Sequence, residues 1–239
     1  SWQPECLCGF NLDRDRGTQD ETCLVKFVRL KPERKKGLIM KKGETSTIGT
    51  RDLVSIGVFG ALSLLIFFVV GGIAGLTVVG TVANIPIVCF FTSIAYLLLA
   101  AKVRKTGTFL IMGTINVLPG LMAANVFGVI GSIAGWVLAE VVATRIGYSN
   151  RKGLVAAYVV GCTLQSALYT LPIYLSAAQY LSERREILRL TDETMAQFVA
   201  MFSGSMYVGM VVLTTVMSLV GAFVSLKIMR KHFEKAGIV

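Results

Sequence analysis

Six long apolar segments constrain the fold of this chain more than any other feature of its sequence. They cover roughly residues 52–72, 84–101, 107–124, 126–146, 153–177 and 205–229. Each holds about 18–25 residues, and at ~1.5 Å per residue a helix of that length crosses a hydrocarbon core ~30 Å thick. The sequence therefore predicts an all-α integral membrane protein, with a six-helix transmembrane bundle over residues 51–239.

Composition supports this class. Hydrophobic residues make up 54% of the chain and charged residues 16%, with a mean hydropathy of +0.68. A soluble domain carries about 25% charged residues. The net charge of +10 would suggest nucleic acid as the partner of a soluble protein. Here Lys and Arg flank apolar spans, and no base-stacking aromatics interleave with them, so we expect no binding of nucleic acid.

The loops between the spans differ sharply in charge, and this difference predicts the orientation. One set of flanks is basic: Lys41, Lys42, Arg51, Lys102, Arg104, Lys105, Arg145, Arg151, Lys152, Lys227, Arg230, Lys231 and Lys235. The first and third loops on the other side are uncharged, and the fifth (178–204) has three Arg against four acids. Cytoplasmic loops collect Lys and Arg. We therefore expect both termini in the cytoplasm and a multi-pass protein of the bacterial cytoplasmic membrane, surrounded by lipid.

Residues 1–50 form a separate polar segment. Their low hydrophobicity and dense charge are typical of a flexible region, and they contain no apolar core of a signal peptide. Met40 precedes the short polar stretch KKGETSTIGTRD that leads into the first span. We hypothesise that Met40 is the native start and that residues 1–39 are translated leader.

The familiar catalytic constellations are missing from the spans. The only histidine, His232, lies in the C-terminal tail, and the chain has neither an H-E-x-x-H motif nor a G-x-x-x-x-G-K-[ST] loop. Cys6, Cys8 and Cys23 lack the spacing of a zinc module. We expect no enzymatic activity, no metal site and no cofactor.

Glu140 is the one acid well inside a span. Charge in a membrane is costly, so such a residue suggests a function by default. Its position near the predicted cytoplasmic end of the fourth span favours a structural brace, or a hinge, over a substrate ligand. Arg145, Arg151 and Lys152 are candidate partners, as is a polar group on a neighbouring helix.

Polar and aromatic residues gather in the predicted outer half of the spans. A few polar groups in an apolar bundle can orient a small ligand. From position we predict a substrate pocket formed by Asn84, Asn125, Gln165, Tyr169 and Tyr174. The long fifth loop has the apolar spacing of an amphipathic helix, which would either cover such a pocket or lie on the membrane surface.

The first span contains a pair of small residues, Gly57 and Ala61, four positions apart. Small residues allow helix backbones to approach closely in a bilayer. The pair is consistent both with packing inside the bundle and with docking of a partner helix.

Three stretches together resemble the Trep_Strep family of small bacterial membrane proteins, which are regarded as candidate S components of energy-coupling-factor (ECF) transporters. They are RDLVSIGVFGAL at the first span, GWVLAEVVATRIGYSNRKGLVAAYVV around Glu140, and the ending MRKHFEKAGIV. The resemblance covers about residues 50–239.

The resemblance implies a six-helix protein that captures a micronutrient from outside. It also implies a transmembrane T component and two ABC-type ATPases as partners. In S components small residues on the first helix pack against the T component, which favours that role for Gly57 and Ala61, with Gly in place of the first Ala. Two other functions stay open: a self-sufficient secondary carrier, and a membrane protein without transport activity that assembles into an oligomer.

Overall fold

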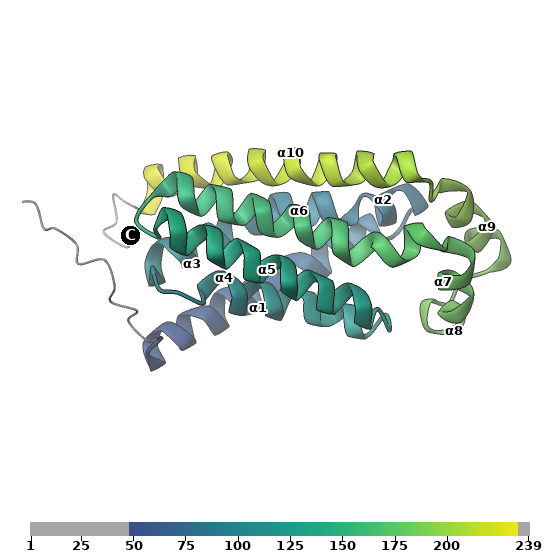
Figure 1. Ribbon diagram of the computed structural model, residues 1–239, viewed down its shortest axis with the longest axis horizontal. Helices are drawn as coiled ribbons and strands as arrows, with labels where there is room; N and C mark the ends of the chain where they lie inside the picture. Colours follow the sequence, from purple (N-terminus) through teal and green to yellow (C-terminus); the bar gives the residue numbers. More distant parts are fainter. Residues whose placement is uncertain (1–47, 234–239) are drawn as a thin grey trace, which may run out of the picture. The chain divides into compact units, whose positions relative to one another are not determined.

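The computed structural model describes residues 48–233, and side chains up to Lys231. The polar segment 1–50, the Met40 hypothesis and Lys235 therefore lie almost wholly outside the described residues. Within the described part the chain is helical, without strands (Figure 1). Its elements in order are α1 (Thr50–Ala74), α2 (Val78–Val82), α3 (Asn84–Val103), α4 (Thr108–Val117), the 3₁₀ turn η1 (Leu118–Leu121), α5 (Val126–Ile146), α6 (Arg151–Leu175), α7 (Ala177–Glu183), α8 (Arg185–Leu188), α9 (Asp192–Met201), α10 (Gly204–Ile228) and the π-helical turn η2 (Met229–Phe233).

Five helices are long and apolar enough to cross a membrane: α1, α3, α5, α6 and α10. They correspond to five of the six predicted spans. The third predicted span, 107–124, is instead a shorter apolar helix, Thr108–Leu121. Pro119 lies in its last turn and has no N–H for the helical ladder, so the α-helix changes to a 3₁₀ turn at Leu118. The prediction of six spans is thus supported for five segments.

α3 is the most buried of the long helices. In its most apolar window 67% of the residues are buried, against 17% for α1. Tyr96 of α3 stacks on Trp136 of α5 with ring centroids 5.0 Å apart. Trp136 in turn lies against two glycines: a Cβ added at Gly113 or Gly161 would fall 2.2 or 2.3 Å from its ring. The close packing of α4, α5 and α6 depends on this arrangement.

Short polar side chains join the helices inside the bundle. Ser63 of α1 donates to Asn116 of α4 at 2.7 Å, and Thr214 of α10 donates to Ser166 of α6 at 3.0 Å. Hydrogen bonds of this kind are a common means of helix association in membranes. They keep the buried hydroxyls satisfied in a core that is otherwise apolar.

The two ends of the bundle differ. At one end α3, α5 and α10 end and α1 and α6 begin, with their basic flanks; we call this the basic end. At the other end α7, α8 and α9 form a helical segment beside α2 (Figure 1). This segment, residues 177–201, is called the cap. The amphipathic helix predicted for the fifth loop is therefore present as three short helices.

Candidate functional site

A cavity of ≈ 350 Å³ lies beneath the cap. Four of the five residues predicted to bind substrate line it: Asn84, Asn125, Tyr169 and Tyr174. They come from the start of α3, the N-cap of α5 and the last turns of α6, which meet at this end of the bundle. The other lining residues are Thr81, Val82, Ile85, Ala123, Thr170, Ile173, Tyr180, Leu188 and Phe202.

Asn125 holds two elements of the cavity wall together. Its Oδ1 accepts the N–H of Gly128 at 3.1 Å, which caps α5. Its Nδ2 donates to the carbonyl of Tyr169 at 3.0 Å and so joins α5 to α6. The residue before it, Ala124, has a left-handed backbone (φ 53°), which turns the chain sharply into α5.

Asn84, which lines the cavity, carries an acceptor without a partner on the side that faces α1. Its Oδ1 is buried and has no hydrogen-bond partner among the described residues. The amide lies against α1, where a Cβ on Gly71 would come within 3.0 Å of the same oxygen. A buried polar atom without a partner costs about 1–3 kcal/mol, and a ligand in the cavity would recover that cost only if the amide rotated toward it.

A second cavity of ≈ 470 Å³ adjoins the first, and the two share Thr81, Ile173, Leu188 and Phe202. One aromatic ring, that of Phe202, belongs to both walls. Tyr174 packs edge-on against Phe202 with centroids 4.9 Å apart and lies 5.2 Å from the ring of Tyr207. Because Leu188 and Phe202 belong to the cap or follow it directly, both cavities depend on the cap for their outer wall.

Arg184 fastens the cap to the bundle. Its Nη2 donates to the carbonyl of Ala124 at 3.1 Å, and its guanidinium lies 3.9 Å over the ring of Tyr180. It also pairs with Glu183 at 3.2 Å. Burial raises the pKa of the Tyr180 phenol, which therefore stays neutral against the cavity. Arg184 thus joins the cap to the loop before α5, next to the cavity-lining residue Ala123.

Gln165, the fifth residue predicted for the pocket, is not part of the cavity lining. Its Oε1 accepts the indole N–H of Trp136 at 2.9 Å. Gln165 lies one helical turn deeper in the bundle than Tyr169, and its amide bonds to Trp136 in the core.

Glu140 is held by a helix N-terminus. The carboxylate is 7% exposed, and it accepts the N–H groups of Gly107, Phe109 and Leu110 at 2.8, 3.0 and 3.3 Å. Tyr148 donates its hydroxyl at 2.6 Å. Burial first, and then the carboxylate, raises the pKa of Tyr148, so its hydroxyl remains a donor. The side chain closes the first turn of α4; of the two kinds of partner that the sequence suggested, a basic residue and a polar group on a neighbouring helix, the observed contacts are of the second kind.

Gly57 and Ala61 both lie on the exposed face of α1. No atom lies within 4 Å of a Cβ placed on Gly57, whereas one on Gly60 would meet Ile115 at 3.2 Å. Gly60 therefore serves packing within the bundle, and Gly57 faces outward.

Several cavity residues were not predicted from the sequence, chiefly Thr81, Tyr180 and Phe202. Thr81 lies in the short α2, and Tyr180 belongs to the cap. The cluster of Tyr and Phe around the fifth loop was the available signal for the last two. Among the described residues no group of three His, Cys, Asp or Glu is placed to hold a metal ion.

Comparison with known proteins gives one match. The model of a family described as "hypothetical bacterial integral membrane protein (Trep_Strep)" matches residues 50–235. No curated protein and no solved structure matches the chain.

Proposed function

The chain belongs to the Trep_Strep family of bacterial integral membrane proteins, and we propose that it is the substrate-binding S component of an ECF-type importer. In this proposal the chain captures a small micronutrient from outside and has no catalytic activity of its own. A T component and two ABC-type ATPases supply the energy. The observation that carries the proposal is the cavity beneath the cap.

The charge of the two ends supports an outward-facing cavity. The basic end carries Lys and Arg from five helix termini, whereas the cap combines Arg184, Arg185 and Arg189 with Glu183, Glu186, Asp192 and Glu193. By the positive-inside rule the basic end belongs in the cytoplasm, together with both termini. The cavity then opens toward the outside, as capture of an external substrate requires.

The lining of the cavity suits a small and largely apolar ligand. It combines aromatic rings with a few amides and hydroxyls; among the described residues no carboxylate lines either cavity, and Arg189 lines the second one. Small-molecule sites are commonly built this way, from apolar walls and a few polar groups that orient the ligand. Asn84, with its unpaired acceptor, is the group we expect to set that orientation.

The outer face of α1 supports docking. Gly57 and Ala61 lie together on it, and the apolar Val54 and Leu65 extend the same stripe. A helix of a partner can approach closely where the side chains are this small. We propose that the T component packs here.

Capture is tested by mass spectrometry of the small molecules that co-purify with the full-length protein. We expect one compound to be retained by the wild type and lost from Asn84→Ala. Gln165→Ala is the matched control: it removes an amide outside the lining, so it should retain the compound. Equal retention by both variants would contradict the assignment of the cavity.

Docking is tested by pull-down with co-expressed T component and ATPases. Gly57→Leu should prevent assembly, while Gly72→Leu, another exposed α1 glycine with no atom within 4 Å of its Cβ, should assemble normally. Normal assembly of Gly57→Leu would refute the docking face. Uptake that continues without the ATPases would favour a secondary carrier instead, and self-association without uptake would favour the oligomeric alternative.

A further inference from the structure

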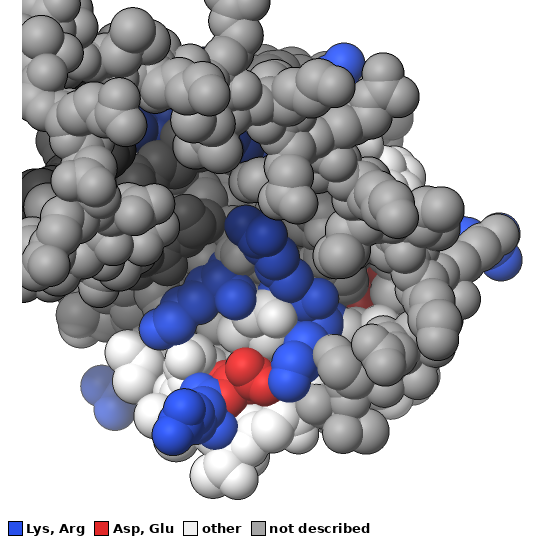
Figure 2. Space-filling view, turned by 90° about the vertical axis from the view of Figure 1, so that its left-hand side faces the viewer, with Lys and Arg blue, Asp and Glu red and all other residues white. Residues whose placement is uncertain are grey.

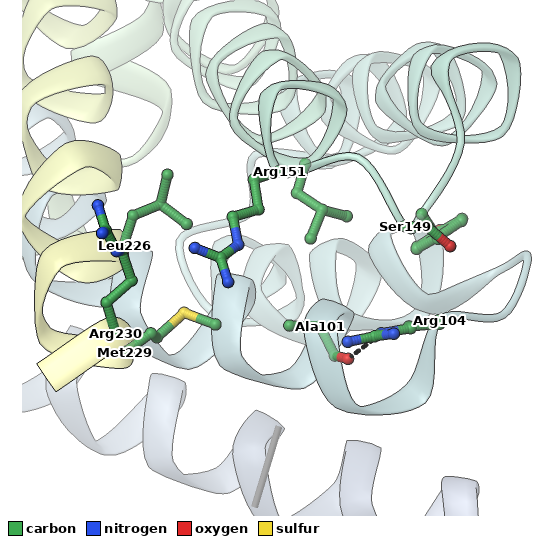
Figure 3. A pocket seen from close by; sticks show the side chains of 9 residues that line it. Ala101, Arg104, Ser149, Arg151, Leu226, Met229 and Arg230 are labelled. Atoms are coloured by element: carbon green, nitrogen blue, oxygen red, sulfur yellow. Dashed lines mark hydrogen bonds between the residues drawn. The ribbon is translucent and has the colours of Figure 1, made fainter. Parts of the chain in front are cut away.

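Three arginines from separate helices surround a small cavity at the basic end. Arg104 follows α3, Arg151 begins α6, and Arg230 follows α10. The cavity measures ≈ 70 Å³, and Ala101, Leu226 and Met229 supply apolar parts of its wall. In Figure 3 the side chain of Arg151 lies between those of the other two. These three arginines are far apart in the chain, and the packing of the helices brings them together.

The backbone fixes the position of Arg104. The residue ends α3 in a left-handed conformation (φ 50°, ψ 31°), and its Nε donates to the carbonyl of Ala101 at 2.7 Å, the dashed contact in Figure 3. This bond uses one edge of the guanidinium. The terminal nitrogens remain as a planar pair of donors, a geometry that matches phosphate oxygens.

The surroundings of this cavity carry a strong excess of positive charge. Figure 2 shows Lys and Arg side chains gathered on this end of the molecule. Among the described residues only two acids lie here, Asp52 and Glu140. Asp52 pairs with Lys105 at 2.6 Å, and Glu140 is bound to the N-terminus of α4. Both carboxylates thus have partners other than Arg104 and Arg230.

An apolar groove begins at Arg151, next to the arginine cavity. It has a volume of ≈ 510 Å³, lies between α6 and α10, and shares Arg151 and Leu226 with the arginine cavity. Val155, Val159 and Phe223 are typical of its lining. From Arg151 to Val160 the groove follows α6 for roughly 14 Å, about half of the ~30 Å hydrocarbon core. It therefore has the length of one leaflet.

We propose that this composite site binds an anionic phospholipid. The phosphate occupies the arginine cavity, whose ≈ 70 Å³ corresponds to about two water molecules at ~30 Å³ each and so suits a compact oxyanion. An acyl chain occupies the groove between α6 and α10. A soluble phosphate compound would use the arginines alone, and the continuity of cavity and groove favours the lipid. The proposal is independent of the importer function.

The test is native mass spectrometry of the full-length protein in detergent, with added phosphatidylglycerol or phosphatidylcholine of the same chain length. We expect phosphatidylglycerol to be retained more strongly. A direct charge-assisted hydrogen bond from each arginine to the phosphate contributes about tenfold or more, so Arg104→Gln/Arg151→Gln/Arg230→Gln should weaken retention by on the order of 100-fold at least. All three side chains are exposed, so this variant should fold, which its unfolding temperature checks.

Two matched controls make the result specific. Lys102→Gln/Arg145→Gln/Lys231→Gln removes the same charge from exposed positions outside the cavity and should retain phosphatidylglycerol. Ala156→Phe fills the groove and should weaken retention, whereas Ala134→Phe, on an exposed position of α5, should not. Equal losses in the two charge variants would overturn the site. Unchanged lipid retention in Ala156→Phe would overturn it as well, and so would arginine-dependent binding of pyrophosphate with no preference between the lipids.

Discussion

Removal of the Glu140 carboxylate is expected to cost more stability than any single exposed substitution. In Glu140→Ala the first turn of α4 loses its acceptor for three N–H groups, and Tyr148 loses the acceptor of its hydroxyl. Loss of a helix cap costs about 1–2 kcal/mol. A hydrogen bond to a charged acceptor contributes about 1.5–3 kcal/mol. We therefore expect the free energy of unfolding to fall by about 3–5 kcal/mol.

Glu140→Gln separates charge from shape. The amide keeps one acceptor oxygen but places an NH₂ group where the other oxygen accepted a hydrogen bond. Tyr148 can rotate its hydroxyl to accept from this NH₂ group, but the N–H of Gly107 cannot. The expected loss is about 1.5–3 kcal/mol, smaller than for alanine.

The assay is denaturant unfolding of the detergent-solubilised protein, followed by circular dichroism. Glu186→Ala, at an exposed position of the cap, is the control and should stay within about 0.5 kcal/mol of wild type. A double-mutant cycle with Tyr148→Phe should show that the phenylalanine substitution is costly only when Glu140 is present. If Glu140→Ala unfolds within 0.5 kcal/mol of wild type, the reasoning from these contacts is refuted.

Three further outcomes follow from the packing and the charges. Gly113→Ala forces a Cβ to within 2.2 Å of Trp136 and should lower the free energy of unfolding by about 1–3 kcal/mol; Gly72→Ala, in open space on α1, should instead raise it by about 0.5–1 kcal/mol, both by denaturant unfolding. Arg184→Ala removes the contact between the cap and the α4–α5 loop, so amide hydrogen exchange in residues 177–201 should accelerate while α3 stays protected. An unchanged exchange rate in the cap would contradict the role of Arg184 in holding it. The raised pKa of Tyr148 means that the folded state keeps a proton that the unfolded state loses above pH ~10. The wild type should therefore lose up to about 1.4 kcal/mol more stability per pH unit than Tyr148→Phe in that range, and equal slopes would contradict the shift.

Most of the helix pattern could be predicted, because runs of apolar residues have no alternative in lipid except a helix. The exception is 107–124, where hydropathy continues through Pro119 although the α-helix cannot. Hydropathy measures the preference for an apolar medium. It does not report the hydrogen bonds that determine where a helix ends.

The cavity residues were predictable as a group. Asn84 and Asn125 lie where their helices begin and Tyr174 lies where α6 ends, and the predicted topology places all three at the same end of the bundle. Gln165 shows the limit of this argument. Its depth in the bundle and the direction of its side chain are determined by core packing, and its amide carbonyl accepts a hydrogen bond from the indole N–H of Trp136. Likewise, the main-chain partners of Glu140 belong to a turn more than 30 positions earlier, which no local pattern in the sequence encodes, although its partner Tyr148 lies only eight positions later.

The structure adds most to the sequence-based interpretation at Gly57, because it shows which way this glycine faces. An exposed apolar helix face is ordinary in lipid, so the exposure of α1 alone does not identify a partner. A glycine within a helix, however, costs about 1 kcal/mol relative to alanine. Gly60 is explained by its contact with Ile115, but nothing inside the bundle approaches Gly57. Gly72 also faces open space, yet bulky residues lie four positions to either side of it, whereas Gly57 is followed by Ala61 on the same face. We therefore propose that a helix outside this chain packs against Gly57, and the pull-down with Gly57→Leu tests this proposal.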